Sequence, residues 1–172
     1  MVIKRKKKQP PKMFPLLCWD IAAHGMQKLY TNQELRMLTT LATKFDWTID
    51  IPQLMQKPHE AIVVTDLQQR IHWASPGFLS MTGYTPTFAK NKRPAFLQGR
   101  NTSTVTRAAI RQAVAERKPI RAALMNYRKD GTEYLCEVDI LPVSTSKNIV
   151  THFIAFEREV PSTHEHDTPG TH

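Results

Sequence analysis

Apolar residues early in the middle of the chain follow a strand pattern and then a helix pattern. Residues 61–66 and 70–74 are two short apolar runs separated by a turn, and together they predict a β-hairpin. Ser75 then offers a capping side chain and Pro76 suits a first helical position. A short helix is therefore expected to follow the hairpin and to end near Gly83.

A longer helix and three further strands are predicted after this point. Residues 102–117 carry most of their apolar side chains, Val105 included, on one side of a helix, with arginines interspersed. Three later segments alternate between apolar and polar positions, as half-buried strands do: residues 120–128, 132–143 and 149–160. Asp130-Gly131 is a strong hairpin signal between the first two of these strands.

Residues 16–58 read as a helical extension that precedes the hairpin. Thr31 and Glu34, three positions apart, form a capping-box pattern. An apolar stripe then recurs at helical spacing: Leu35, Leu38, Leu41, Ala42 and Phe45. This stripe must bury either against the following domain or against the same helix of a partner.

The element order predicts an α+β domain over residues 59–160, in which helices cover one face of an antiparallel sheet. Residues 1–15 are charged and rich in proline, and residues 161–172 have almost no apolar content. Both ends are therefore expected to be disordered tails. The chain thus divides into a basic tail, a helical extension, one compact domain and a C-terminal tail.

Composition narrows the classes of protein. The 172 residues have a hydrophobic content of 41%, and no window approaches the ~18 apolar residues of a membrane span. No secretory signal is recognised. Cys18 and Cys136 lie too far apart to suggest a disulfide framework or zinc spacing. A cytoplasmic location and no membrane partner are therefore expected.

The formal net charge of +9 is concentrated near the N-terminus, where six cations occur: Lys4, Arg5, Lys6, Lys7, Lys8 and Lys12. Such a run can contact nucleic acid or anionic lipid, but a solvated tail is the simpler interpretation. No helix-turn-helix, zinc or RNP-like motif supports nucleic-acid binding. Phosphate loops, nucleophile elbows and HExxH motifs are also absent from the sequence, so no enzyme activity is expected. The tail histidines, His164, His166 and His172, are not expected to form a specific metal site.

Four motifs in the compact domain resemble the LOV branch of PAS sensor domains: MTGY at 81–84, FLQG at 96–99, NYRKDG at 126–131 and THFI at 151–154. Each motif alone is weak, but their order and spacing are specific. The resemblance covers residues 60–160. It implies the PAS fold, with a five-stranded antiparallel sheet, helices on one face, and here an N-terminal helical extension.

The resemblance also implies a flavin pocket, in which Gln98 lies beside the ring, Asn126 bonds its polar edge and Arg111 contacts the phosphate. Other family positions differ in this chain: Pro94 occupies the photoactive cysteine position, Arg93 and Ala95 replace its neighbours, Cys136 replaces a second ring-binding Asn, and Glu157 replaces the signal-relaying Gln. Each matching residue also has a structural interpretation: Asn126 could satisfy backbone groups, Gln98 could fix a loop, and Arg111 could be a solvated or ion-paired side chain. Cys136, which departs from the family, could be a small core residue.

These departures decide what chemistry is expected. Pro94 has no thiol, so a flavin–cysteinyl adduct is excluded. A flavin group left unpaired beside Cys136 would cost about 1–3 kcal/mol. A buried Glu157 has a raised pKa, and in its protonated form it would resemble the family's amide. FMN is therefore a candidate cofactor, but the residues that differ from the family argue against it. The identity of the ligand stays open.

The sequence favours a sensory or regulatory PAS module in signal transduction, with a LOV-like pocket. One alternative is a ligand-free PAS module for protein interaction or dimerisation through the N-terminal helix or the sheet face. The least favoured alternative is a nucleic-acid-associated protein that uses the basic tail.

Overall fold

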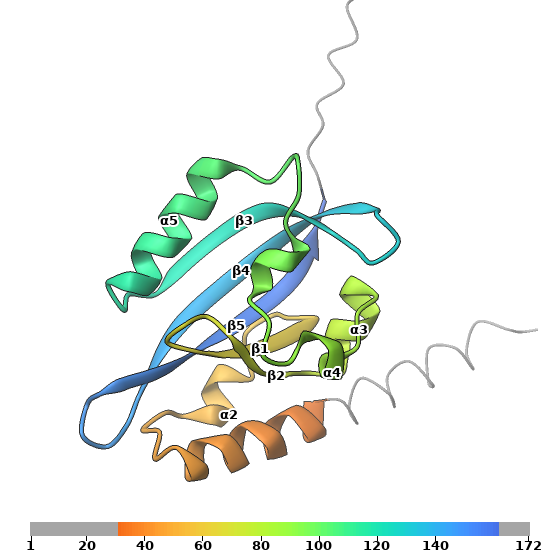
Figure 1. Ribbon diagram of the computed structural model, residues 1–172. Coiled ribbons are helices and arrows are strands. Elements are labelled where there is room, and N and C mark those ends of the chain that lie inside the picture. The colour runs from red at the N-terminus through yellow and green to blue at the C-terminus, as the bar shows by residue number, and fades with distance from the viewer. Residues whose placement is uncertain (1–30, 162–172) are drawn as a thin grey trace, which may run out of the picture.

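The computed structural model describes residues 31–161 of the chain. Its elements run in this order: a helix over residues 31–44, α2 (Ile51–Leu54), β1 (Ala61–Asp66), β2 (Ile71–Ala74), α3 (Gly77–Thr82), α4 (Pro86–Ala89), the 3-10 turn η1 (Pro94–Leu97), α5 (Thr104–Ala115), β3 (Ile120–Tyr127), β4 (Glu133–Ser144) and β5 (Val150–Val160) (Figure 1). The expected basic tail, the first part of the helical extension and all of the C-terminal tail after residue 161 lie outside the described residues.

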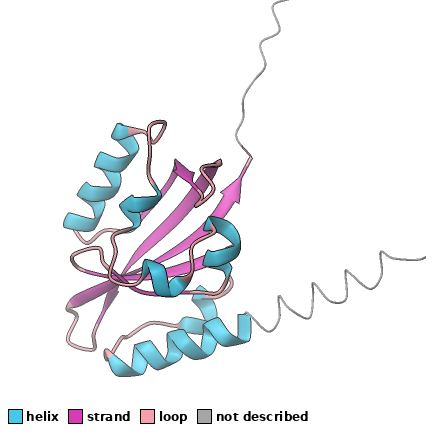
Figure 2. Ribbon diagram, turned by 45° about the vertical axis from the view of Figure 1, so that its right-hand side comes forward, coloured by secondary structure: helices cyan, strands magenta, loops and turns pink. Residues whose placement is uncertain are grey.

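The five strands form one antiparallel sheet in the order β2-β1-β5-β4-β3. β5 is the central strand and pairs with β1 on one side and β4 on the other. Helices α3, α4 and α5 cover one face of this sheet, here called the inner face (Figure 2). The predicted fold class is therefore confirmed, with the five-stranded antiparallel sheet, its helices and the N-terminal helix all present.

The N-terminal helix packs on the opposite, outer face of its own sheet. Leu38 and Leu41 are buried there with Trp47, Ile154 and Phe156. Full burial of one leucine side chain stabilises a fold by about 1.5–3 kcal/mol. Of the two expected arrangements of the apolar stripe, the structure has the one in which the stripe buries against the following domain of the same chain.

Two glycines show why the recognised motifs have their residue types. Gly83 of the MTGY motif ends α3 at φ 75°, a left-handed conformation that other residues adopt only with strain. A Cβ on Gly99 of the FLQG motif would lie 2.4 Å from the Tyr127 ring. The Tyr127 hydroxyl in turn accepts a hydrogen bond from the Asn101 backbone N–H at 2.9 Å. The FLQG loop is thus fastened to the end of β3.

Two local expectations were wrong. Ser75 does not cap α3, because its hydroxyl accepts the backbone N–H of Ile62 at 3.0 Å and so links β1 to the start of the helical segment. Val105 does not face the core and is 78% exposed, because α5 turns Ile110 and Val114 toward the sheet.

Candidate functional site

A cavity of about 310 Å³ lies between α5, η1 and the inner face of the sheet. Ligand pockets in proteins usually measure about 300–1,000 Å³, so this one is at the small end of the range. Its walls are mainly apolar: Leu97, Ile110, Val114, Leu124, Val138 and Phe153 line it. α5 covers the sheet at this place without filling the space below it.

The inner wall of this cavity contains polar side chains that lack partners. Asn126 on β3 is 6% exposed, and Glu157 on β5 is 5% exposed. Asn126 Oδ1 and Glu157 Oε2 are both buried and make no hydrogen bond among the described residues. An unsatisfied buried polar atom costs about 1–3 kcal/mol. A bound molecule with complementary hydrogen-bonding groups would remove that cost.

Tyr134 adds a third unpaired buried atom, its hydroxyl oxygen, directly opposite Asn126 in the β3–β4 register. Burial raises the pKa of Tyr134, and neighbouring Cys136 and Glu157 add to the rise. The Asn126 amide opposes part of it, yet the hydroxyl makes no hydrogen bond of ordinary geometry in the described part of the chain. The tyrosine therefore stays protonated and retains a proton to donate.

Burial also sets the protonation of the two other titratable groups here. It raises the pKa of Glu157 to about 7, so the carboxyl is largely neutral in mildly acidic solution and can donate a hydrogen bond. Burial likewise raises the pKa of Cys136 and keeps it a thiol. The inner end of the site is therefore neutral and offers both donors and acceptors.

Three arginines line the same cavity from its helical side. Arg107 and Arg111 lie one turn apart on α5, and Arg93 precedes η1. Arg93 Nε donates to the Gln68 carbonyl oxygen at 3.1 Å. Glu157 is the one acidic residue among those that line the cavity, and it lies on β5. The arrangement can hold a ligand whose neutral polar end meets β3 and β5 and whose anionic end meets the arginines.

The structure brings most of the expected site residues together. Gln98, Arg111, Asn126 and Glu157 all line this cavity, and so does Pro94. Cys136 does not line it. This residue is fully buried in the inner core, where it pairs with Leu124 on one neighbouring strand and Glu159 on the other.

Sequence reasoning missed Arg107 as a member of the site. Arg107 was detectable, because it lies four residues before Arg111 and so shares its helix face. Tyr134 lies beside the site and does not line it, and nothing in the sequence pattern showed that its hydroxyl lacks a partner. That property depends on the packing of β3, β4 and β5 together.

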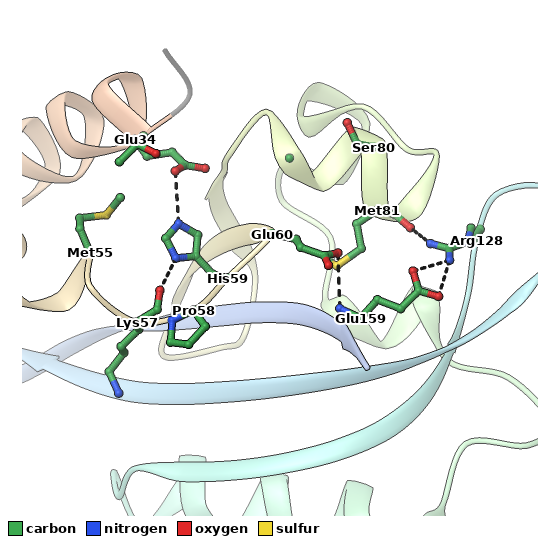
Figure 3. Close-up of a pocket in the computed structure, with 12 residues that line it drawn as sticks. Glu34, Met55, Lys57, Pro58, His59, Glu60, Ser80, Met81, Arg128 and Glu159 are labelled. Carbon is green, nitrogen blue, oxygen red and sulfur yellow. Dashed lines mark hydrogen bonds and ion pairs between the residues drawn. The ribbon is translucent and has the colours of Figure 1, made fainter. Parts of the chain in front are cut away.

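A second, more open cavity of about 600 Å³ lies where the N-terminal helix, residues 55–60, α3 and the ends of β3 and β5 meet (Figure 3). Its polar groups pair with one another. Arg128 donates to Glu159 and to the Met81 carbonyl oxygen, while His59 joins Glu34 to the Lys57 carbonyl (Figure 3). The residues of this cleft thus connect the N-terminal helix to the sheet, and we assign no ligand to it.

Two further findings concern residues 31–161. None of their helices has the length and apolar character needed to cross a bilayer. None of their His, Cys, Asp and Glu side chains gathers in a group of three or more that could hold a metal ion.

The sheet order, the single covering layer of helices and the cavity beneath α5 define a class of α+β domains with an internal site. Comparison with known families identifies which one. The PAS domain family model matches residues 59–160, and the chain belongs to this family.

Similar proteins include regulators and sensors. The nitrogen fixation regulatory protein of Klebsiella oxytoca is 31% identical over 62% of this chain and 22% of that protein. The human voltage-gated inwardly rectifying potassium channel KCNH3 is 30% identical over 77% of this chain and 12% of its own length. The light-state LOV domain of the photoreceptor Aureochrome1 superposes with a TM-score of 0.59 at 27% identity, over 66% of this chain and 91% of that domain. The chain therefore spans only a small part of these curated relatives.

Proposed function

We propose that this chain is a sensory or regulatory PAS module whose inner cavity binds a small ligand. The observation that carries the proposal is the pair of unpaired buried atoms, Asn126 Oδ1 and Glu157 Oε2, which line the same cavity. A domain stabilised only by packing gains nothing from such atoms, whereas a ligand with complementary groups turns both into hydrogen bonds. The relatedness to a nitrogen fixation regulator and to a LOV photoreceptor supports a role in signalling.

The residues present fit the noncovalent part of a flavin site. Asn126 and Glu157 would meet the polar edge of the ring, Gln98 lies in the same wall, and Arg111 would meet a phosphate. A bound flavin would supply blue-light absorption and redox chemistry. Pro94 offers no sulfur, so the module would signal without forming a flavin–cysteinyl adduct.

The signal would leave the cavity through β5. Glu157 faces the cavity, and the preceding residue, Phe156, faces the outer cluster. The Phe156 ring lies 5.4 Å from the His59 ring, and His59 contacts Glu34 on the N-terminal helix. A ligand that changes the hydrogen bonding of Glu157 would therefore alter a strand on which the helix rests, a population shift between two packings.

The experiment titrates the purified protein with FMN and with riboflavin, which lacks the phosphate, and follows flavin fluorescence and thermal unfolding. We expect FMN to bind more tightly than riboflavin, because only FMN has an anion for the arginines. Asn126→Ala should weaken both ligands, while Thr104→Ala, an exposed change on α5, should weaken neither. If neither flavin binds, FMN is rejected as the ligand.

The ligand-free alternative makes a different prediction. If the module acts only by protein interaction, Asn126→Leu and Glu157→Leu should stabilise the fold, because both remove unpaired polar atoms. Both variants should then also keep the regulatory activity of the protein. Loss of that regulatory activity in well-folded variants supports the ligand site. A homodimer through the Leu38 stripe would need the helix to leave the sheet, so we propose partner binding on other surfaces. No catalytic role is proposed.

A further inference from the structure

The helical layer over the inner face is entirely free of acidic residues. Between Asp66 and Glu116 the chain has no Asp or Glu and carries seven cations: Arg70, Lys90, Lys92, Arg93, Arg100, Arg107 and Arg111. The other described residues carry twelve carboxylates and ten cations. This segment folds into β2, α3, α4, η1 and α5, so the helices that cover the inner face carry cations and no carboxylates (Figures 1 and 2 show these helices).

None of these seven side chains forms an ion pair within residues 31–161. Three of them bond neutral backbone oxygens: Arg70 that of Asn91, Lys92 that of Phe88, and Arg93 that of Gln68. Arg93, Arg107 and Arg111 also share the wall of the inner cavity. Three of the seven cations thus lie around one cavity, and within residues 31–161 no ion pair compensates the charge of any of the seven.

Exposed apolar side chains also occur in the helical layer. Of the five large hydrophobic residues that are exposed in the described structure, Leu79, Phe88 and Val105 lie on its helices, and Leu67 lies in the turn between β1 and β2. Their exposed fractions run from 38% for Leu67 to 78% for Val105. Cations and apolar side chains on one acid-free face are the combination that binds a charged interface with an apolar interior.

We propose that this helical layer binds the surface of an anionic phospholipid membrane. Each Lys or Arg near such a surface contributes about 1 kcal/mol, and exposed apolar side chains add affinity by entering the headgroup region. Binding to a membrane surface needs no spanning segment. The expectation of no membrane partner rested on the lack of such a segment, so it does not bear on surface binding.

Nucleic acid fits this surface less well. Binding of bases uses aromatic rings with a free face. The Phe88 ring is stacked on Tyr84 at 4.9 Å, and Lys92 Nζ lies 4.1 Å from the Phe88 centroid. The aliphatic side chains of Leu79 and Val105 offer no stacking surface. The exposed apolar groups of the layer therefore suit lipid better than bases.

The test is co-sedimentation of the full chain with vesicles of phosphatidylcholine, alone or with about one third phosphatidylserine, near physiological salt. The variant Lys90→Gln/Lys92→Gln/Arg93→Gln removes three cations of the layer. The matched control, Arg36→Gln/Lys44→Gln/Lys147→Gln, removes three exposed cations elsewhere. Each triple variant removes one lysine that makes a cation–π contact: Lys92 lies over Phe88, and in the control Lys44 lies over Phe45. Both proteins keep the basic N-terminal run.

We expect binding to the anionic vesicles only. The layer variant should partition about a hundredfold more weakly, and the control should change far less. Circular dichroism and thermal unfolding must first show both variants folded. If the two triple variants lose vesicle binding equally, the binding comes from diffuse charge or from the basic N-terminal residues, and the proposal is overturned. Failure to bind vesicles would also overturn it, and binding of duplex RNA or DNA with the same dependence would assign the layer to nucleic acid.

Discussion

The buried pair between Glu34 and His59 should make the docking of the N-terminal helix depend on pH. His59 Nδ1 lies 2.7 Å from the Lys57 carbonyl oxygen, which only accepts, so Nδ1 carries a proton. His59 Nε2 lies 3.3 Å from Glu34 Oε2, and an ionised carboxylate also only accepts. Both contacts form together when the imidazole is doubly protonated, so the pair requires the imidazolium.

The sign of the pH dependence follows from the pKa of His59. Burial by itself lowers this pKa, but the hydrogen bonds to Glu34 and to the Lys57 carbonyl, with the charge of Glu34, outweigh burial and raise it. The folded pKa therefore lies above the unfolded value of about 6.5. The pair of His59 and Glu34 stabilises the folded state fully when the pH is below the unfolded pKa of His59. This contribution is lost as the pH rises through the folded pKa of His59.

The variant Glu34→Gln isolates this effect. The two side chains are only 10% and 5% exposed, so solvent screens the contact weakly. At about pH 5.5 we expect the free energy of unfolding of the variant to be about 1.5–3 kcal/mol lower than that of the wild type, which is the magnitude of one hydrogen bond to a charged group. Near pH 8.5 the difference should approach zero, because an amide N–H can donate to the neutral ring.

Urea unfolding of both proteins across this pH range measures the difference, and subtraction cancels groups that titrate alike in the two proteins. The control is Glu60→Gln, the same substitution at another carboxylate of the cleft, which accepts a hydrogen bond from the Glu159 backbone N–H. It leaves the pair of Glu34 and His59 intact, so it should not reproduce the pH-dependent difference expected of Glu34→Gln. A Glu34→Gln difference that is constant, or that grows with pH, would refute the reasoning.

Three further predictions concern the fold and the inner cavity. Leu38→Ala should lower the free energy of unfolding by about 2–5 kcal/mol in urea, and a fully stable variant that only changed its oligomeric state would contradict packing on its own sheet. Because burial raises the pKa of Glu157 to about 7, the free energy of unfolding of the wild type should fall by about 3 kcal/mol relative to that of Glu157→Gln as the pH rises from about 4.5 to 7.5. Parallel profiles of the free energy of unfolding against pH for the two proteins would be inconsistent with that burial. Gly77→Ala should destabilise more than Gly131→Ala, since the new Cβ would lie 1.8 Å from the Glu60 carbonyl oxygen at the first site, whereas at the second it meets no atom and the cost is only the backbone strain of φ 88°; a smaller thermal shift for Gly77→Ala would count against that clash.

The strands were predictable because side-chain alternation reports burial directly. Tyr134, Cys136 and Val138 were placed on one face of their strand, and all three are buried in the inner cluster. The weakly amphipathic α5 was harder, because its underside faces a cavity rather than a packed core. Val105 was therefore assigned to the core although it is 78% exposed.

The sequence pattern predicted a residue's place at the cavity where a strand or helix face fixed it, and it could not do so where packing decided. Asn126 and Glu157 lie on the inner faces of their strands, so both reach the cavity. Cys136 lies one pleat repeat from Val138 along β4, and that step separates the packed core from the cavity wall. The contact between Glu34 and His59 had no local signal, because it joins two elements that meet only in the folded chain.

The central position of β5 explains why the cavity and the N-terminal helix can be coupled in so small a domain. Glu157 pairs with Ala61 on β1 and with Val138 on β4, so a shift of this residue affects both neighbouring strands. Its backbone carbonyl also accepts the N–H of Glu60, the residue after His59. The backbone therefore connects a buried carboxyl whose pKa is about 7 to the segment that contacts Glu34. A ligand bound at one face of β5 and the helix docked at the other would thus act on the same strand, which is the physical requirement for coupling between the two sites.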